Sequence, residues 1–83
     1  MAVVSGDYVD FVVRYEGNTE RCRITEAALL DRERVIDEHL NHGQLIAIFV
    51  KHRAEIEYLA IAKMQREEHS DHGFVLTTED LNP

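Results

Sequence analysis

The sequence is poor in the features that mark several large classes of protein. Its 83 residues include one cysteine, one proline and no tryptophan, and its purely apolar runs are only a few residues long. A single cysteine excludes an internal disulfide framework and fits a reducing compartment. A membrane-spanning helix needs about 20 consecutive apolar residues, and the N-terminus lacks the basic start and apolar core of a secretion signal. We therefore expect a cytoplasmic protein without a membrane span.

Positive charge is also scarce, with 9 basic residues against 16 acidic ones and a net charge of -7. Proteins that bind nucleic acids usually present a basic face, because neutralising phosphates supplies most of their non-specific affinity. This balance disfavours nucleic acid and anionic membranes as partners. With 45% hydrophobic and 30% charged residues, the chain has the composition of a globular protein. Its length predicts one domain over residues 1–83, with an ordered core at about 8–78 and short flexible tails.

The clearest local pattern is a β-hairpin near the N-terminus. Residues 8–15 (YVDFVVRY) alternate between an apolar and a mixed face, and residues 19–24 form a second strand with the same period. We place the two-residue turn at residues 17–18, where glycine can supply a positive φ. This turn sets Val13 opposite Cys22, so that the apolar faces of the two strands coincide.

Two helices and a third strand are expected after the hairpin. Thr25 is the predicted N-cap of the first helix, which stops at Gly43 unless the charged residues 31–34 break it. Residues 44–69 contain no glycine or proline and predict one continuous helix, roughly 40 Å long at 1.5 Å per residue. Residues 74–78 form the third strand. The predicted fold is α+β in the order β-β-α-α-β, with two helices covering one face of a three-stranded antiparallel-type sheet.

The predicted second helix has two apolar sides. The side that suits the sheet contains Leu45, Phe49, His52, Ile56 and Leu59. The opposite side carries a second row, named here the outer stripe, which consists of Ala47, Val50, Ala54, Tyr58 and Ile61. Either the first helix packs over the outer stripe and makes it core, or a second copy or another protein docks there. The charges beside it are mixed in sign, which argues against a membrane-surface or calmodulin-type helix.

Three arginines share the other face of the predicted hairpin. These are Arg14, Arg21 and Arg23, with Arg14 directly opposite Arg21 in the predicted register. Facing like charges cost some stability unless an anion or an acidic side chain relieves them. A sheet face with arginines and an aromatic residue is similar to the surfaces on which some proteins stack single-stranded nucleic acids. The alternative is a solvated face with locally paired charges.

The remaining reactive side chains predict no catalytic or metal site. Histidines form two H-x-x-H pairs, His39 with His42 and His69 with His72. Zinc usually takes three or four ligands, and histidine is favoured near helix C-termini without any metal. Cys22 is expected to face the core as an inert thiol. Because no phosphate-binding loop, nucleophile elbow or dinucleotide-binding glycine motif occurs, we expect no enzymatic activity, no metal and no cofactor.

Three short motifs resemble a known family in their order and spacing. They are CRIT at residues 22–25, HRAEIE at residues 52–57 followed by Lys63, and VLTTED at residues 75–80. Together they are similar to the bacterial domain-of-unknown-function family 1488, which consists of small single-domain proteins. The resemblance implies an α+β fold and a bacterial cytoplasmic protein, and it supplies no activity, cofactor or catalytic residue. The sequence DRER at residues 31–34 departs from the family pattern, which suggests a longer or bent first helix.

The function that we expect from the sequence is a non-catalytic interaction or regulatory module. Its outer stripe would contact either a second copy, giving a homodimer, or another protein partner. The alternative function is binding of an anionic ligand or single-stranded nucleic acid by Arg14, Arg21 and Arg23. In the motif at residues 52–57, the alternative to a functional role is an Arg53–Glu57 pair that stabilises the helix.

Overall fold

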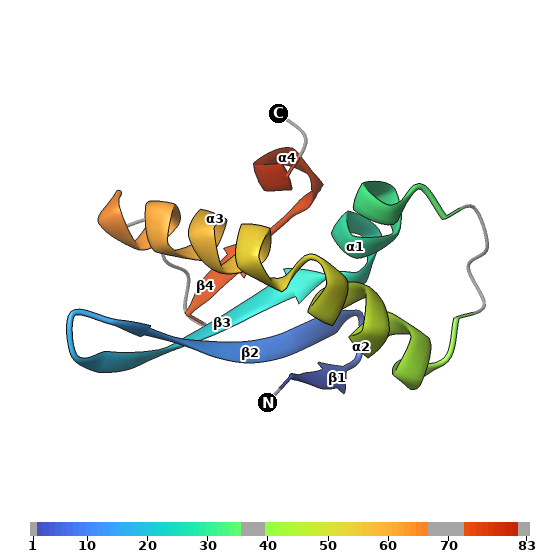
Figure 1. Cartoon of the computed structure of the whole chain (residues 1–83), viewed down its shortest axis with the longest axis horizontal. Coiled ribbons are helices and arrows are strands. Elements are labelled where there is room, and N and C mark those ends of the chain that lie inside the picture. Colours follow the sequence, from blue (N-terminus) through green and yellow to red (C-terminus); the bar gives the residue numbers. More distant parts are fainter. Residues whose placement is uncertain (1, 36–39, 67–72, 82–83) are drawn as a thin grey trace.

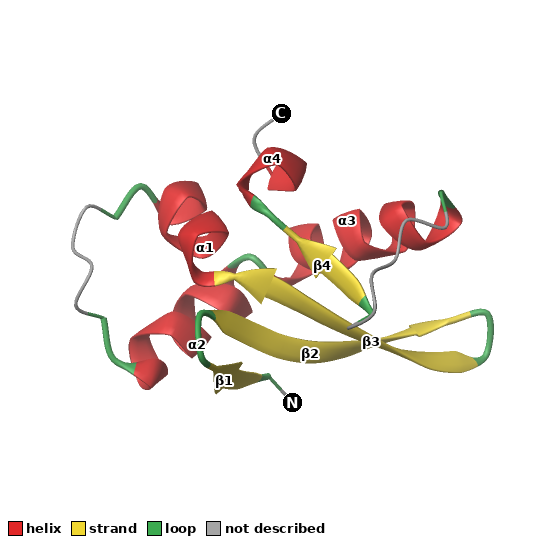
Figure 2. Ribbon diagram, turned by 180° about the vertical axis from the view of Figure 1, so that it is seen from behind, coloured by secondary structure: helices red, strands yellow, loops and turns green. Residues whose placement is uncertain are grey.

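The computed structural model describes residues 2–35, 40–66 and 73–81. The elements in chain order are β1 (Val3–Ser5), β2 (Tyr8–Tyr15), β3 (Asn18–Thr25), α1 (Glu26–Glu33), α2 (His42–Lys51), α3 (Arg53–Gln65), β4 (Phe74–Leu76) and α4 (Thr78–Leu81). Helices α2 and α3 cross one face of a twisted sheet (Figure 1). Seen from behind, the opposite face is not covered by any helix of the described residues (Figure 2). The predicted α+β class, with helices over one face of a sheet, is confirmed.

The sheet has four strands in the order β1-β2-β3-β4, one more than predicted. β1, β2 and β3 are antiparallel, but β4 runs parallel to β3, with Val75 beside Arg23, so the sheet is mixed. The parallel pairing follows from the helices between β3 and β4, which return the chain to the end where β3 began. β1 and α4 lie in segments for which the sequence predicted flexible tails. The tail residues 1 and 82–83 lie outside the described residues.

The hairpin turn sits one residue earlier than predicted. Glu16 and Gly17 form it, with φ values of 52° and 82°, as the type I′ turn of a two-residue hairpin requires. Moving the turn by one residue shifts every cross-strand partner by two. Cys22 therefore pairs with Phe11 rather than Val13, so the predicted register is wrong. A shift of two keeps each side chain on its predicted face.

Helix α1 is shorter than predicted because the charged residues 31–34 end it. The Thr25 hydroxyl caps its start by accepting a hydrogen bond of 3.1 Å from the Ala28 N–H. At the other end Arg34 takes a left-handed conformation with φ 60°. The helix therefore does not continue to Gly43, and the alternative given in the sequence analysis, a break at the charged residues 31–34, is confirmed.

Gly43 instead lies in the first turn of α2. The Asn41 side chain accepts a hydrogen bond of 2.8 Å from the Gln44 N–H, and the Gln44 side chain accepts one of 2.9 Å from the Asn41 N–H. This reciprocal pair is a capping box. It satisfies two backbone donors that would otherwise be unpaired, so the helix begins here.

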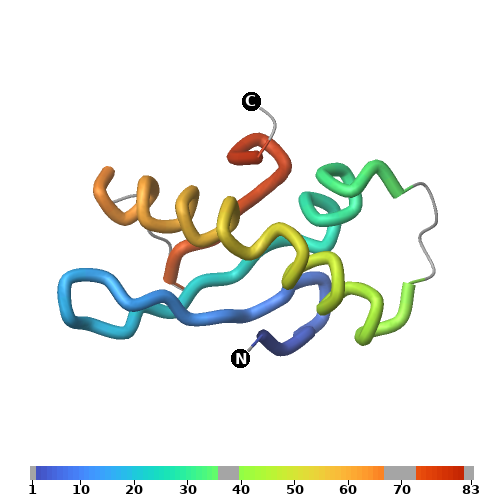
Figure 3. The backbone as a smooth tube through the Cα atoms, in the orientation of Figure 1, coloured from blue at the N-terminus to red at the C-terminus, as the bar shows by residue number. Residues whose placement is uncertain are grey.

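The predicted continuous helix over residues 44–69 is broken at His52. This residue has φ -106° and ψ 16°, and its N–H is shared between the carbonyls of Ile48 and Phe49 at 3.2 Å each. The backbone tube changes direction at this point, between α2 and α3 (Figure 3). The bend allows α2 to pack over β1 and α3 over β4 of one twisted sheet. Residues 67–69 of the predicted helix lie outside the described residues.

The core lies between the inner face of the sheet and helices α1, α2 and α3. Its largest fully buried side chains are Val9, Ile24, Leu29, Phe49, Ile56 and Leu76. The rings of Phe11 and Phe49 pack with their centroids 5.0 Å apart and their planes tilted by 51°. In the described part of the chain, no polar or charged residue is fully buried. Nor do these residues include a helix with the length and apolar character needed to cross a membrane.

Candidate functional site

The outer stripe lies mostly on the surface. Ala47, Val50, Ala54 and Tyr58 are exposed, Val50 to 57% and Tyr58 to 71%, whereas Ile61 is half-buried against the core. The exposed part consists of two residues of α2 and two of α3, on either side of the break. The expectation that α1 covers the stripe therefore does not hold for these four residues.

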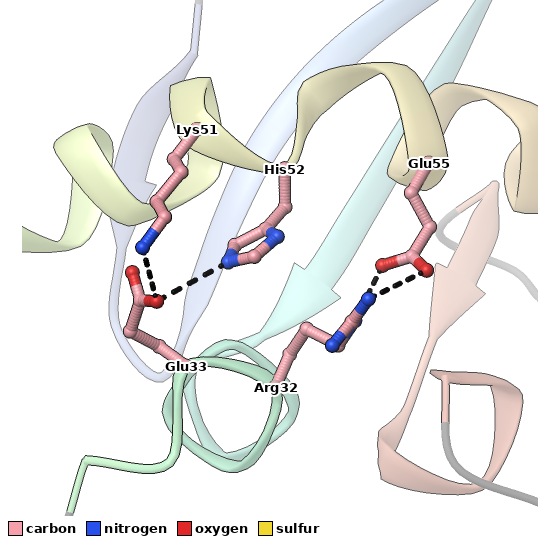
Figure 4. Close-up of polar contacts among 5 residues, drawn as sticks. All are labelled: Arg32, Glu33, Lys51, His52 and Glu55. Carbon is pink, nitrogen blue, oxygen red and sulfur yellow. Dashed lines mark hydrogen bonds and ion pairs between the residues drawn. The ribbon is translucent and has the colours of Figure 1, made fainter.

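Helix α1 packs beside the stripe instead, along one flank of α2 and α3 (Figure 4). The Arg32 guanidinium donates two hydrogen bonds, of 2.6 and 3.0 Å, to the Glu55 carboxylate. This bond holds the pKa of Glu55 below its usual value. About two fifths of each side chain is exposed, 42% of Arg32 and 39% of Glu55, so this surface pair adds little to the stability of the fold.

A second contact joins the end of α1 to the break between α2 and α3 (Figure 4). The Glu33 carboxylate accepts a hydrogen bond of 2.7 Å from the Lys51 ammonium, which lowers the pKa of Glu33. Nε2 of the half-buried His52 lies 3.5 Å from the same oxygen and makes no hydrogen bond within the described part of the chain. His52 and Glu55 of the HRAEIE motif thus both face α1, where Glu55 accepts hydrogen bonds from Arg32 and His52 lies beside Glu33.

The same motif contains an ion pair along the second flank of the outer stripe. Nε of Arg53 lies 2.9 Å from a carboxylate oxygen of Glu57, one helical turn later. The Arg53 guanidinium also lies over the Phe49 ring, 5.9 Å from its centroid. The sequence analysis gave this Arg53–Glu57 pair as the alternative to a functional role of the motif, and the pair is present. The stripe is therefore bordered by one acid and one base on each side.

The third motif, together with Lys63, forms a clamp between α3, β4 and α4. The Lys63 ammonium donates to the Val75 carbonyl at 2.7 Å and to Oδ2 of Asp80 at 3.0 Å. The same Asp80 oxygen accepts the Thr77 N–H at 2.8 Å and the Thr77 hydroxyl at 3.2 Å. The ionic groups are well shielded, with 15% of the Lys63 side chain and 19% of Asp80 exposed. The Thr77-x-x-Asp80 spacing is that of a capping box, and this signal in the sequence could have predicted the start of α4.

The three arginines share the uncovered sheet face as predicted, but in a different register. Arg14 lies opposite Thr19, and Arg21 lies opposite Val12. The predicted opposition of Arg14 and Arg21 is wrong, because the turn lies one residue earlier. Their like charges therefore do not face each other across the strands.

Arg23 is already engaged with side chains of β2. It lies opposite Asp10, and its Nε is 2.9 Å from that carboxylate. Its guanidinium also stacks 4.2 Å above the centre of the Tyr8 ring. Arg14 and Arg21 are exposed and form no ion pair with any described residue. Of the three predicted binding residues, these two remain open to a ligand.

The predicted inert cysteine has the surroundings expected of one. Cys22 is buried, and burial, with a smaller contribution from the Glu20 charge, raises its pKa to about 11. His42 is exposed in the first turn of α2, while His39, His69 and His72 lie outside the described residues. Within the described ranges, no three histidine, cysteine, aspartate or glutamate residues are grouped to hold a metal ion.

The fold and these surfaces define a class: a small α+β domain with helices over one face of its sheet and exposed apolar residues on two of those helices. The chain belongs to the family described as "Protein of unknown function (DUF1488)", whose model matches residues 3–76. This match confirms the resemblance found in the three motifs. No curated protein and no solved structure matches the chain.

Proposed function

We propose that this protein is a non-catalytic interaction module that self-associates through its outer stripe. The observation that carries the proposal is the exposure of Ala47, Val50, Ala54 and Tyr58 on two successive helices. On the other side of the same helices the apolar residues form the core. An exposed apolar row on a folded domain is a candidate surface for contact with another molecule.

The charges around the stripe support a second copy as the occupant. The stripe is bordered by Lys51, Arg53, Glu55 and Glu57, whose charges sum to zero, although the whole chain carries -7. Averaged over the whole surface, the net negative charge opposes the meeting of two copies. At the outer stripe two copies can meet without this repulsion. The apolar area is small, so we expect a weak, concentration-dependent dimer.

The test is the mass in solution, measured by light scattering during gel filtration over a range of protein concentrations. The mass should rise from 9.6 kDa for one chain toward twice that value. Ala54→Glu should abolish the rise while the circular dichroism spectrum stays unchanged, because Ala54 is exposed. Ala27→Glu is the matched control, since Ala27 is an exposed alanine on α1. A mass of one chain at every concentration, or a dimer that survives Ala54→Glu, would overturn the proposal.

A second candidate function is binding of an anionic ligand or single-stranded nucleic acid at the uncovered sheet face. It is supported by Arg14 and Arg21, which lack ion pairs among the described residues. The probe is a fluorescent single-stranded oligonucleotide at low salt, whose binding should weaken steeply as salt is added. The double change Arg14→Ser with Arg21→Ser should abolish binding, whereas Arg34→Asn should leave it, because Arg34 is exposed elsewhere and asparagine tolerates its left-handed backbone. No binding at low salt would remove this candidate.

The location that we propose is the bacterial cytoplasm. The proposal draws on the family resemblance and on the single free cysteine, which suits a reducing compartment.

A further inference from the structure

We infer that the second copy docks antiparallel, with a two-fold axis at Ala54. This inference rests on the proposed self-association and adds its geometry. The outer stripe is symmetric about Ala54 in sequence: Val50 and Tyr58 lie four residues before and after it, and Ala47 and Ile61 lie seven residues before and after it. A symmetric row of this kind can meet its own copy when the copy is reversed end to end.

The antiparallel arrangement matches side chains by size. A residue before the axis then shares a level with the residue equally far after it on the other copy. Val50 lies beside Tyr58 of the second copy, and Ala54 lies beside its own copy, where the small side chain lets the helices approach closely. In a parallel pair Tyr58 would meet Tyr58 and Val50 would meet Val50, which places two bulky rings at one level and leaves a gap at another.

The reversal also brings opposite charges together on both flanks. On a helix Arg53 and Glu57 lie on the same flank, and across the axis this flank faces the same flank of the second copy. Arg53 is one residue from Ala54 and Glu57 is three, so Arg53 and the Glu57 of the other copy lie about 3 Å apart along the helix. By the same count, Lys51 lies about 3 Å along the helix from Glu55 of the other copy on the opposite flank. The axis also brings Arg53 beside Arg53 and Glu55 beside Glu55 of the other copy, so each flank gains two contacts between opposite charges and one between like charges.

The break in the helix falls close to the axis. His52 lies two residues from Ala54, so α2 of one copy contacts α3 of the other. Helix α1 does not obstruct this contact, because the Arg32–Glu55 and Glu33–Lys51 pairs hold it to one flank. The exposed residues nearest the axis, Val50, Ala54 and Tyr58, therefore form the centre of the interface.

Cysteine cross-linking of the full chain tests the register. Ala54→Cys should form a disulfide-linked dimer under mild oxidation with oxidised glutathione, because the two cysteines meet at the axis. Ala47→Cys should not, because residue 47 lies in α2, seven residues from the axis and beyond the break, so its two copies lie at opposite ends of the interface. A mixture of Val50→Cys and Tyr58→Cys should give mainly the mixed dimer, identified by mass. The native Cys22 is buried and does not compete, and Ala27→Cys on α1 is the control for random collision.

The outcomes separate this inference from the proposed function. Preferential cross-linking of Ala54→Cys, together with the mixed Val50–Tyr58 dimer, supports the antiparallel register. Equal cross-linking of Ala47→Cys and Ala54→Cys would overturn it in favour of a parallel pair, while loss of the dimer in Ala54→Glu would still support self-association through the stripe. A dimer by mass whose stripe cysteines link no faster than Ala27→Cys would overturn the register as well. A single-chain mass at every concentration would overturn both.

Discussion

Asp80 offers the sharpest test of how this domain holds its C-terminal elements. Replacing it with alanine removes the acceptor of three hydrogen bonds, from the Lys63 ammonium and from the N–H and hydroxyl of Thr77. A hydrogen bond between charged groups contributes about 1.5–3 kcal/mol, and a helix-capping bond contributes about 1 kcal/mol. Asp80→Ala should therefore lower the free energy of unfolding by about 2–4 kcal/mol. For a domain of this length each kcal/mol lowers Tm by roughly 4–8 °C, so Tm should fall by roughly 8–30 °C.

The loss of stability in Asp80→Ala should be larger at neutral pH than at acidic pH. Burial alone would raise the pKa of Asp80, but the Thr77 N–H and the Lys63 ammonium outweigh burial and hold that pKa below its usual value. The folded state thus favours the charged carboxylate. The stabilisation by Asp80 is complete above pH of about 4, the ordinary pKa of an unfolded aspartate. It disappears as the pH falls through the lowered pKa of the folded state.

Urea unfolding followed by circular dichroism, at pH 7 and at pH 3, measures both effects. The wild-type chain should exceed Asp80→Ala in stability at pH 7, and the gap should narrow at pH 3. Glu79→Ala is the control, because Glu79 is exposed in the same short helix and its loss should cost under about 0.5 kcal/mol. A loss as small as that control, or a gap that is equal at both pH values, would refute the role assigned to the clamp.

Three further predictions concern the core, the thiol and the turn. Phe49→Ala removes a fully buried ring that packs on Phe11 and should cost about 3–5 kcal/mol in urea unfolding, whereas a cost under about 1 kcal/mol would contradict its burial. Cys22, with its pKa raised to about 11, should react with Ellman's reagent at pH 8 only after denaturant is added, and rapid labelling of the folded chain would be inconsistent with this environment. Glu16→Asn should raise stability by about 0.5 kcal/mol, because asparagine tolerates the positive φ at the first turn position, and a lowered Tm would argue against this turn.

The inward faces of the hairpin could be predicted from sequence, but its register could not. Alternation over residues 8–15 and 19–24 decides which side chains face the core, and a shift of two residues leaves that choice intact. Two dipeptides containing Gly17, namely Glu16-Gly17 and Gly17-Asn18, both fit a two-residue turn. The choice between them depends on the complete sheet, including β1 and β4, whose short strands carry weak signals of their own.

The helix boundaries were misjudged for two different physical reasons. Gly43 suggests a helix stop, but Asn41 and Gln44 form the stronger signal, a capping box that starts a helix around it. No proline or glycine near His52 predicts the break. The break arises because a straight helix cannot follow the twisted sheet from β1 to β4, and the local sequence does not show this constraint.

Helical periodicity, at 100° per residue, predicted which residues form the outer stripe, but it did not predict whether the stripe is exposed. Exposure depends on where α1 lies, and α1 is placed by tertiary ion pairs. Arg32 and Glu33 attach it to Glu55 and Lys51 on one flank, and the left-handed Arg34 ends it there. A longer first helix could have covered the stripe. The charged residues 31–34 are therefore the residues that leave this surface open.

The motif residues support the stability of the fold, whereas the outer stripe supports self-association, and the two roles can be tested separately. His52, Glu55, Lys63 and Asp80 hold neighbouring helices and strands together, so substitutions among them act on the fold. The exposed stripe contributes little to the stability of the single chain.

Asp80→Ala should thus lower Tm strongly yet leave the dimer dissociation constant of the folded protein within about twofold, since Asp80 does not belong to the stripe. Ala54→Glu should do the reverse: it should abolish the dimer and change the Tm of dilute, monomeric protein by only a few degrees. If Ala54→Glu instead unfolds the dilute monomer, the stripe is part of the fold, and the self-association built on its exposure fails with it.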